Sequence, residues 1–414
     1  MNYYGLPEGQ GFAMMFVRVD ILADIGRDVP KTWDDIMETV PHLNARNMEI
    51  GITADTNIHL YQMGGELFAD DGMRINLGSK VGLTAFTKMC EFFTKHGFPY
   101  TYDAANRFRT GEMPILIGDY TGLYNQLKVF ATEIDGLWAM YPVPGTVQLD
   151  EDGNVLYDEN GDPVINNCAV SSVNASVIVK GADEKGKVED AWTYIKWFTG
   201  KECQESYGNE MVAIMGPSAK YNTANRDALA NVPWTAEERV RIEAQFNNLA
   251  SIPNYPGSYI IARYVDFAFM AAYNDGADPS QSLQSYIHTI NEEITRKRAE
   301  FGLETLSASE TLASKRLSQA EVALGEMKSR GVGDQAIWDV IQDAIDNNDA
   351  TVLQSASEDV MAMLSVAEQE SCLYSVKISR GPDVTDKKEI DDTELVYYVS
   401  VALSDAARAL ESYK

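Results

Sequence analysis

The chain has 414 residues, 45% of them hydrophobic, which is enough for two or three domains with substantial cores. Its 34 Lys and Arg residues against 62 Asp and Glu residues give a formal net charge of −28. This charge repels phosphate backbones and anionic lipid, so nucleic acid is excluded as an expected partner. No stretch reaches the roughly 18–20 unbroken apolar residues of a membrane-spanning helix.

The first 120 residues alternate helices with a short apolar strand. Thr32 and Asp35 have the spacing of a capping box, which predicts a helix over 32–44. Apolar residues at helical spacing predict a second helix over 79–96, and a third is expected over 103–110, ending at Gly111. The apolar run 114–117 then predicts a buried strand.

The middle of the chain continues the same α/β pattern. A second apolar run, 177–179, predicts another buried strand, and helices are expected over 186–199, 235–248, 258–274 and 280–301. Turn signals between short β-prone pieces predict a projecting hairpin over 149–167. Its acidic residues invite comparison with a calcium loop, but Pro163 stands at the position of the required glycine, which favours a solvated turn.

After about Glu304 the composition shifts to Ala, Ser, Glu and Asp, and aromatic residues become rare. Helical periodicity over 306–330, 333–347, 349–372 and 391–413 predicts a separate helical bundle, to which the sequence assigns no function. The four cysteines are far apart, and the four histidines lack the i, i+4 spacing of a metal-binding helix. The sequence therefore predicts no disulfide framework, no bound metal and no cofactor.

Several blocks of sequence occur in an order that resembles one protein family. They are PKTWDDI (30–36), GGELF (64–68), FRTGEMPILIGDY (108–120), YPVPGT (141–146), SSVNASVIVKGADEKGKVEDAWTYIKWFT (171–199) and SIPNYPGSY (251–259). Together they resemble family 1 extracellular solute-binding proteins of ABC importers, the maltose-binding type, over residues 3–303. No single block is diagnostic, and the argument depends on their shared order.

The resemblance implies an α/β, periplasmic-binding-protein-like two-lobe fold of type II with an incomplete first lobe. It places lobe 2 at 8–142 and 214–303 and a partial lobe 1 at 1–7 and 143–213, followed by the helical extension 304–414. The opening βα units of the first lobe have no counterpart in this chain. We therefore expect an exposed apolar face around residues 170–200.

The same resemblance implies ligand-binding positions. In the family, the residues after the block that ends at Tyr120 face the cleft between the lobes, which points to Asp119, Tyr120, Thr121 and Tyr124. Aromatic faces stack on sugar rings while carboxylates and amides bind the hydroxyl groups. The alternative is that Tyr120 and Tyr124 pack in the core, one helical turn apart.

Further candidates come from other blocks. Tyr259 and Arg263 begin the helix after SIPNYPGS, where family members often have a cleft-facing aromatic residue. Arg263 at this position favours a charged or strongly hydroxylated ligand, and a surface salt bridge is the alternative. The remaining candidates are Asp55, Asn57, Ser172, Asn174 and, near the hinge, Arg18.

The implied function is non-catalytic. The chain is expected to bind a small-molecule solute, a sugar or oligosaccharide, between two lobes and to present it to the permease subunits of an ABC importer. The full-length protein would be extracellular and tethered to the cell surface, although no export signal is present in this chain. The alternatives are a glycoside hydrolase, which needs only two suitably spaced carboxylates, and a surface scaffold that acts through its helical tail.

Overall fold

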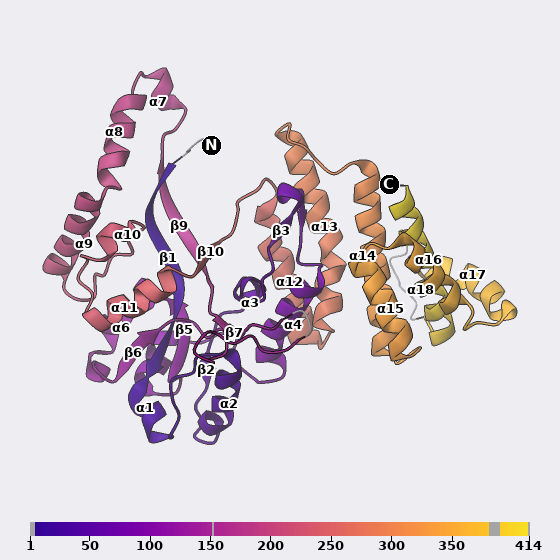
Figure 1. The fold of residues 1–414 in the computed structure, drawn as a ribbon, viewed down its shortest axis with the longest axis horizontal. Helices are drawn as coiled ribbons and strands as arrows, with labels where there is room; N and C mark the ends of the chain where they lie inside the picture. The colour runs from indigo at the N-terminus through magenta and orange to yellow at the C-terminus, as the bar shows by residue number, and fades with distance from the viewer. Residues whose placement is uncertain (1–4, 151–152, 381–389, 413–414) are drawn as a thin grey trace. The chain divides into compact units, whose positions relative to one another are not determined.

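The computed structural model describes residues 5–150, 153–380 and 390–412 (Figure 1). The chain forms two compact units, which are described separately. Unit 1 combines Met1–Gly64 with Lys95–Ile252, and unit 2 combines Gly65–Thr94 with Pro253–Lys414. Residues 1–4, 151–152 and 413, which belong to the predicted first lobe, hairpin and last helix, lie outside the described residues. The lobe boundaries stay a prediction.

Unit 1 contains a mixed β-sheet and a separate two-stranded sheet. Its strands are β1 (Gly5–Arg18), β2 (Ile50–Gly51), β5 (Ile115–Asp119), β6 (Trp138–Tyr141), β7 (Thr146–Val147), β8 (Ile165–Asn166), β9 (Ala169–Val177) and β10 (Leu249–Ser251). The mixed sheet is made of β1, β2, β5, β6, β9 and β10, and the two-stranded sheet is made of β7 and β8. Its helices are α1 (Val19–Asp24), α2 (Trp33–Asn44), α3 (Thr56–Gln62), α5 (Ala104–Thr110), α6 (Tyr120–Phe130), η2 (Thr132–Ile134), α7 (Gly181–Glu184), α8 (Val188–Phe198), α9 (Lys201–Met215), α10 (Arg226–Leu229) and α11 (Ala236–Phe246).

Strand β1 takes part in two sets of strand pairings. Its first half pairs antiparallel with β9, from Gly5 opposite Val177 to Phe12 opposite Ser171. Its second half pairs antiparallel with β5 and β6, beginning with Ala13 opposite Asp119. In Figure 1, β1 runs along the length of this sheet. One strand therefore connects the β9–β10 part of the sheet to the β5–β6–β2 part.

The core of unit 1 is rich in aromatic side chains. Phe12 of β1 stacks on Tyr120 of α6, with ring centroids 4.2 Å apart and planes inclined by 12°. Phe246 meets Phe12 edge-on from α11, and Trp234 lies beside Tyr120. These contacts fix the start of α6 against the middle of β1, since close aromatic packing permits few alternative arrangements.

Gln62, at the end of α3, connects several loops in the interior of unit 1. Its side chain is fully buried. Its Oε1 accepts a hydrogen bond from Trp33 Nε1 at 2.8 Å, and its Nε2 donates to the carbonyl oxygens of Pro144 and Cys168 at 2.9 and 3.1 Å. A buried amide whose donor and acceptor are both satisfied holds its neighbours in one arrangement.

The predicted hairpin is present as β7 and β8 with two further turns between them. Thr146 pairs with Asn166, and isolated bridges join Leu149 to Val155 and Tyr157 to Pro163. The carboxylate of Asp158 accepts hydrogen bonds from the backbone N–H groups of its own turn, and these lower its pKa. The turn is thus closed by its own backbone, as the solvated-turn interpretation requires.

Unit 2 is mainly helical. Its elements are β3 (Phe68–Ala69), η1 (Asp70–Gly72), β4 (Arg74–Ile75), α4 (Lys80–Thr94), η3 (Ser258–Ile260), α12 (Ile261–Asp275), α13 (Pro279–Glu300), α14 (Ala308–Ser329), α15 (Gln335–Asp346), α16 (Ala350–Met361), α17 (Val366–Arg380) and α18 (Asp392–Glu411). Helix α14 packs on α13, where Ser318 Oγ donates to the Gln284 carbonyl oxygen at 3.2 Å. The tail helices thus belong to the same compact unit as α4, α12 and α13. None of the described helices has both the length and the apolar character needed to span a bilayer.

Several sequence predictions are confirmed. Helix α2 begins with the predicted capping box: Asp35 N–H donates to Thr32 Oγ1 at 3.0 Å, and Thr32 N–H donates to Asp35 Oδ2 at 2.9 Å. Helix α5 ends at Gly111, whose φ of 83° lies in the left-handed region that glycine tolerates. The mixed α/β class and the helical extension are also confirmed.

Two predictions of local structure are wrong, and one helix was missed. A strand was expected at 177–179, but the strand in this region, β9, spans Ala169–Val177 and ends where the predicted strand begins. Its sequence is mostly Ser, Asn and Ala, so it lacks the apolar run that is typical of a buried strand. Helix α9 was not predicted, because it has no apolar stripe and buries only Gln204 and Gly208. The helix expected over 349–372 is two helices, since Ser365 and Glu368 cap the start of α17.

Exposed apolar side chains occur around residues 170–200, where an apolar face was expected. On one edge β9 pairs with β1, whereas on the other edge β10 covers only Ala169–Ser171 among the described residues. Large apolar side chains are exposed on β9 and just after it, and on α8: Val173, Val177, Val179, Tyr194 and Trp197. We call this set of five residues the β9–α8 face.

Candidate functional site

The end of strand β5 presents a carboxylate in a fixed orientation. Asp119 is the last residue of β5 and the N-cap of α6. Its Oδ1 accepts hydrogen bonds from Gly122 N–H at 2.6 Å and from Thr121 Oγ1 at 3.1 Å. This geometry is that of a side-chain N-cap, in which the carboxylate oxygen satisfies a backbone N–H group of the first helical turn. One oxygen is thus used for the cap, and Oδ2 remains for another partner.

Asp119 Oδ2 and Ser172 Oγ converge over Gly11. A Cβ atom placed on Gly11 would lie 2.9 Å from each of these two oxygens. Gly11 of β1 pairs with Ser172 of β9. Ala13, two residues farther along β1, pairs with Asp119 of β5. The missing side chain at Gly11 therefore leaves space between a carboxylate and a hydroxyl group at the point where β1 changes partners.

Both polar groups are accessible to solvent. Asp119 and Ser172 are exposed, and so is Asn174, two residues farther along β9 on the same side of the strand as Ser172. Among the described residues, Asp119 Oδ2 accepts no hydrogen bond. A carboxylate oxygen, a hydroxyl and an amide on one surface provide the acceptors and donors that recognise a hydroxylated ligand.

Tyr120 and Tyr124 lie in the core, which corrects their assignment to a ligand surface. Tyr120 is fully buried against Phe12, and burial raises its pKa far above the ordinary value. Tyr124 is 3% exposed, and its hydroxyl donates to Glu238 Oε1 at 2.9 Å. The alternative of core packing describes both residues. Thr121 is also buried and acts through its hydrogen bond to Asp119.

Arg18, at the end of β1, is a buried structural cation. Its Nη2 pairs with Asp20 Oδ2 at 2.7 Å, and its Nη1 donates to the carbonyl oxygens of Phe108 and Arg109 at 3.2 and 3.3 Å. These partners use the guanidinium inside unit 1, so it is neither an exposed charge nor a free ligand-binding group.

Asp55 and Asn57 lie at the start of α3. Asp55 caps the helix by accepting a hydrogen bond from Asn57 N–H at 2.9 Å. Burial raises the pKa of the Asp55 carboxyl. The hydrogen bond between them does not connect them to the Asp119–Ser172 pair, so their role in binding stays a prediction.

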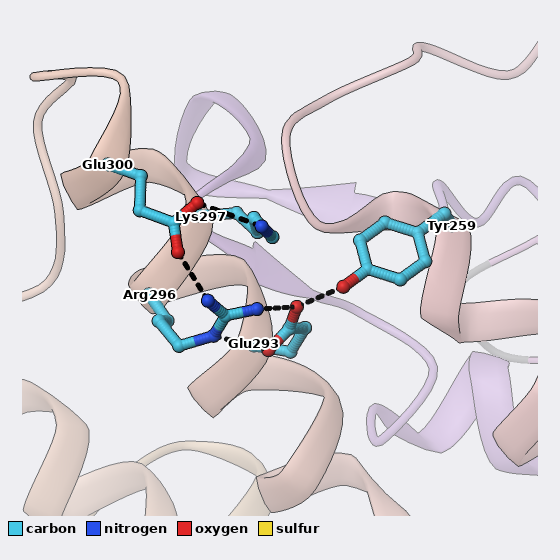
Figure 2. A network of polar contacts seen from close by, with 5 residues as sticks. All are labelled: Tyr259, Glu293, Arg296, Lys297 and Glu300. Carbon is cyan, nitrogen blue, oxygen red and sulfur yellow. Dashed lines mark hydrogen bonds and ion pairs between the residues drawn. The ribbon is translucent and has the colours of Figure 1, made fainter.

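In unit 2, Tyr259 belongs to a network of charged side chains, shown in Figure 2. Its hydroxyl donates to Glu293 Oε1, and Arg296 binds the same carboxylate through Nε at 2.8 Å and Nη2 at 2.5 Å. Arg296 also contacts Glu300, to which Lys297 Nζ donates at 2.8 Å. The hydrogen bonds from Arg296 and Tyr259 lower the pKa of Glu293 to about 2.

Arg263 lies in the first turn of α12 and is exposed. Within the described parts of the chain it forms no ion pair, so the surface salt bridge considered as an alternative is not observed. Its guanidinium keeps all its donors for solvent or for a ligand.

Sequence reasoning missed Gly11 and Glu293. Gly11 matters because the strand register places it opposite Ser172, and no local motif encodes register. Glu293 matters because it contacts Tyr259, which lies 34 residues earlier in the sequence. A glycine inside a strand was the available signal for Gly11, since such a residue often marks a close approach of another chain segment.

No metal site accompanies these residues. Among the residues described, no cluster of three His, Cys, Asp or Glu side chains is placed to hold a metal ion. The arrangement is one of hydrogen-bonding groups on the surface of a β-sheet, which can bind a polar solute.

The fold is similar to that of several solved structures. The sugar-binding protein MalE from the phytopathogen Xanthomonas citri is 16% identical, with a TM-score of 0.57 over 73% of each chain. Maltose-bound MalE3 from T. maritima is 19% identical, with a TM-score of 0.52 over 72% of this chain and 73% of that one. An ABC transporter solute-binding protein from Thermotoga lettingae, bound with α-D-tagatose, is 16% identical, with a TM-score of 0.53 over 70% of this chain and 72% of that one.

A comparison with curated protein sequences gave no match. The family model described as bacterial extracellular solute-binding protein matches residues 1–239, more than half of the chain. The chain therefore belongs to the family of bacterial extracellular solute-binding proteins.

Proposed function

We propose that this protein is the substrate-binding component of an ABC importer and that it binds a carbohydrate or a similar polyhydroxylated solute. The observation that supports the proposal is the convergence of Asp119 Oδ2 and Ser172 Oγ over Gly11. Family members are extracellular solute-binding proteins and not enzymes, which argues against the glycoside hydrolase alternative.

The proposed recognition uses hydroxyl groups of the solute. Asp119 Oδ2 accepts a hydrogen bond from one hydroxyl, and Ser172 Oγ and Asn174 bind its neighbours. Because Asp119 Oδ1 is already fixed by the α6 cap, the acceptor needs little ordering when the solute binds. Tyr259 and Arg263 remain candidates in unit 2, where Arg263 would favour a solute that also carries an anionic group.

The direct test is a binding titration, detected by calorimetry, with a panel of monosaccharides, polyols and oligosaccharides. We expect saturable binding of at least one compound without product formation. Asp119→Asn should weaken that binding about 10- to 100-fold, the range for one hydrogen bond to a charged group. Asp162→Asn is the matched control, since Asp162 is an exposed aspartate on the hairpin turn.

Two results would contradict the proposal. Equal affinities of the wild type and Asp119→Asn would remove Asp119 from the site. No saturable binding across the whole panel would remove the receptor function and favour the surface-scaffold alternative.

The permease and the location at the cell surface are part of the same proposal. We expect solute-loaded protein to stimulate ATP hydrolysis by its permease in proteoliposomes more than solute-free protein does. Fractionation of the producing cells should recover the full-length protein with the membrane. Stimulation that is independent of solute, or recovery only in the culture medium, would contradict these parts.

A further inference from the structure

Unit 2 contains a cavity of about 420 Å³ that the proposed function does not use. Its walls come from the segment that runs from β4 to the start of α4, from α13, from α14 and from the turn between α15 and α16. The volume is within the range of small-molecule sites. The helical extension, to which the sequence assigns no function, therefore supplies part of the wall of a cavity of ligand size.

Gln284 of α13 lines this cavity and carries a buried hydrogen-bond acceptor without a partner. The residue is 6% exposed, and among the described residues its Oε1 accepts no hydrogen bond. Buried polar atoms are normally paired, because an unpaired one loses its hydration without compensation. The oxygen therefore requires a donor that this part of the chain does not supply.

The position of Gly78 shows that Gln284 Oε1 faces this cavity. Gln284 also lines a neighbouring cavity of about 340 Å³, but Gly78 lines only the first of the two. A Cβ atom placed on Gly78 would lie 3.0 Å from Gln284 Oε1. Gly78 does not have a positive φ, so its backbone conformation does not require glycine. The absent side chain instead leaves room beside the oxygen.

The charges of the wall indicate that the missing donor is neutral. Arg74 and Lys80 line the cavity with one carboxylate, Asp346, so an ammonium group would meet two like charges there. An oxyanion is disfavoured as well, because it has no proton to donate to Gln284 Oε1. A hydroxyl group is neutral and can donate to this oxygen.

Other wall residues suit a molecule with several hydroxyl groups. Asn76 and Ser314 are half-buried, and in the described structure neither side chain takes part in a hydrogen bond. Each can both donate to and accept from a hydroxyl group. Ile287 and Leu317 add apolar surface for the carbon skeleton of such a molecule.

We propose that this cavity is a second ligand site, for a small neutral polyol. One hydroxyl group of the polyol donates to Gln284 Oε1 beside Gly78, and others exchange hydrogen bonds with Asn76 and Ser314. Because the wall combines α4 and α13 with α14 and the α15–α16 turn, bound polyol connects the helical extension to the rest of unit 2. The site shares no residue with the Asp119–Ser172 pair, so either site can exist without the other.

The test uses the full chain and calorimetry, with glycerol, sorbitol and myo-inositol as separate probes. We expect saturable binding of at least one of them and no saturation by sodium phosphate or ethylammonium chloride. Polyols also stabilise proteins without binding, so the unfolding temperature alone does not measure binding. Saturation by phosphate or ethylammonium in place of the polyols would overturn the assignment of a neutral ligand. No saturation by any polyol would leave water as the partner of Gln284 Oε1 and would overturn the site.

Two variants locate the site. Gln284→Met replaces the amide by an apolar group of similar size, and it should weaken polyol binding about tenfold, the effect of losing one hydrogen bond. It should also raise the unfolding temperature measured without polyol, because the unpaired buried acceptor is gone. Gly78→Ala should weaken binding as well, since its methyl group would lie 3.0 Å from Gln284 Oε1. Gln335→Met, at an exposed position on α15, is the matched control and should change neither quantity.

Asp119→Asn separates this site from the one proposed in unit 1. We expect this variant to keep the polyol binding that Gln284→Met loses. Loss of polyol binding in Asp119→Asn but not in Gln284→Met would place the polyol in unit 1 and overturn the second site. Equal binding by the wild type, Gln284→Met and Gly78→Ala would overturn it as well.

Discussion

Ser357 of α16 and Ser400 of α18 each donate a hydroxyl hydrogen bond to the other's carbonyl oxygen, both at 2.7 Å. Both side chains are buried among the apolar residues of the tail helices. The reciprocal geometry fixes the two helices in one axial position, because sliding either helix would break both bonds at once.

Ser357→Ala and Ser400→Ala should each lower the free energy of unfolding by about 1 kcal/mol, the net value of one hydrogen bond. The double variant should lower the free energy of unfolding by less than the sum of the two single losses, since the pair acts as a unit. Denaturant unfolding followed by circular dichroism measures these values. Ser355→Ala, on the exposed side of α16, is the control and should be neutral. Full additivity would show that the two bonds are independent.

Gly11→Ala tests the space beside Asp119. The new methyl group would lie 2.9 Å from Asp119 Oδ2 and Ser172 Oγ, so both must move. We expect solute affinity to fall at least about tenfold while the unfolding temperature changes little, because the displaced groups are exposed. Gly9→Ala is the matched control on the same strand, where a Cβ would meet Asn222 only at 3.5 Å. Similar affinity losses in both variants would point to a general effect on β1.

Gln62→Ala should be among the most destabilising substitutions in unit 1. It leaves Trp33 Nε1 and the carbonyl oxygens of Pro144 and Cys168 without their partner, at about 3 kcal/mol or more. Trp33→Phe removes one donor of the same network and should leave one buried acceptor less well satisfied. Chemical unfolding of both variants gives the comparison. If Gln62→Ala lowered the free energy of unfolding by less than an ordinary surface substitution does, water would have replaced the amide as hydrogen-bond partner.

The Glu293 carboxyl should titrate at about pH 2, below its ordinary range near 4.5. Its depressed pKa means that the folded state gains stability from this group above pH 4.5 and loses it as the pH falls through about 2. Arg296→Gln removes the largest cause and should return the pKa toward 4.5, whereas Tyr259→Phe should raise it less. Carboxyl carbon chemical shifts measured against pH report both values. An unchanged pKa in Arg296→Gln would refute the network as its cause.

The β9–α8 face should bind hydrophobic dye and promote self-association. Trp197→Ser removes one of its largest exposed side chains, so dye fluorescence and the associated fraction in sedimentation should both fall. Tyr157→Ser, an equally exposed aromatic on the hairpin, is the control. Monodisperse wild-type protein without dye binding would contradict this expectation.

Local signals in the sequence predicted most of the helices, because caps and stops act over a few residues. Thr32 with Asp35 and the stop at Gly111 are examples, and both appear in the structure as expected. Helix α9 escaped this reasoning because it buries almost nothing, so apolar periodicity had no cause to appear.

The candidate site was less predictable, since it depends on pairings between distant strands. A local pattern cannot distinguish the exposed Asp119 from the adjacent Tyr120, whose ring turns inward to meet Phe12. Nor does it show that Arg18 has Asp20 and two carbonyl oxygens as partners. Gly11 became meaningful only when register placed it beside Ser172.

Strand β1 has 14 residues in one run, about 45 Å at roughly 3.3 Å each, and it belongs to both groups of paired strands. The two sets of strands therefore cannot slide past each other, and any change in the angle between them must come from torsion of β1. Torsional resistance is lowest where a residue has no Cβ, and Gly11 is such a residue at the point where the partners change. We therefore expect one of the points where β1 twists most easily to lie beside the groups proposed to bind the solute.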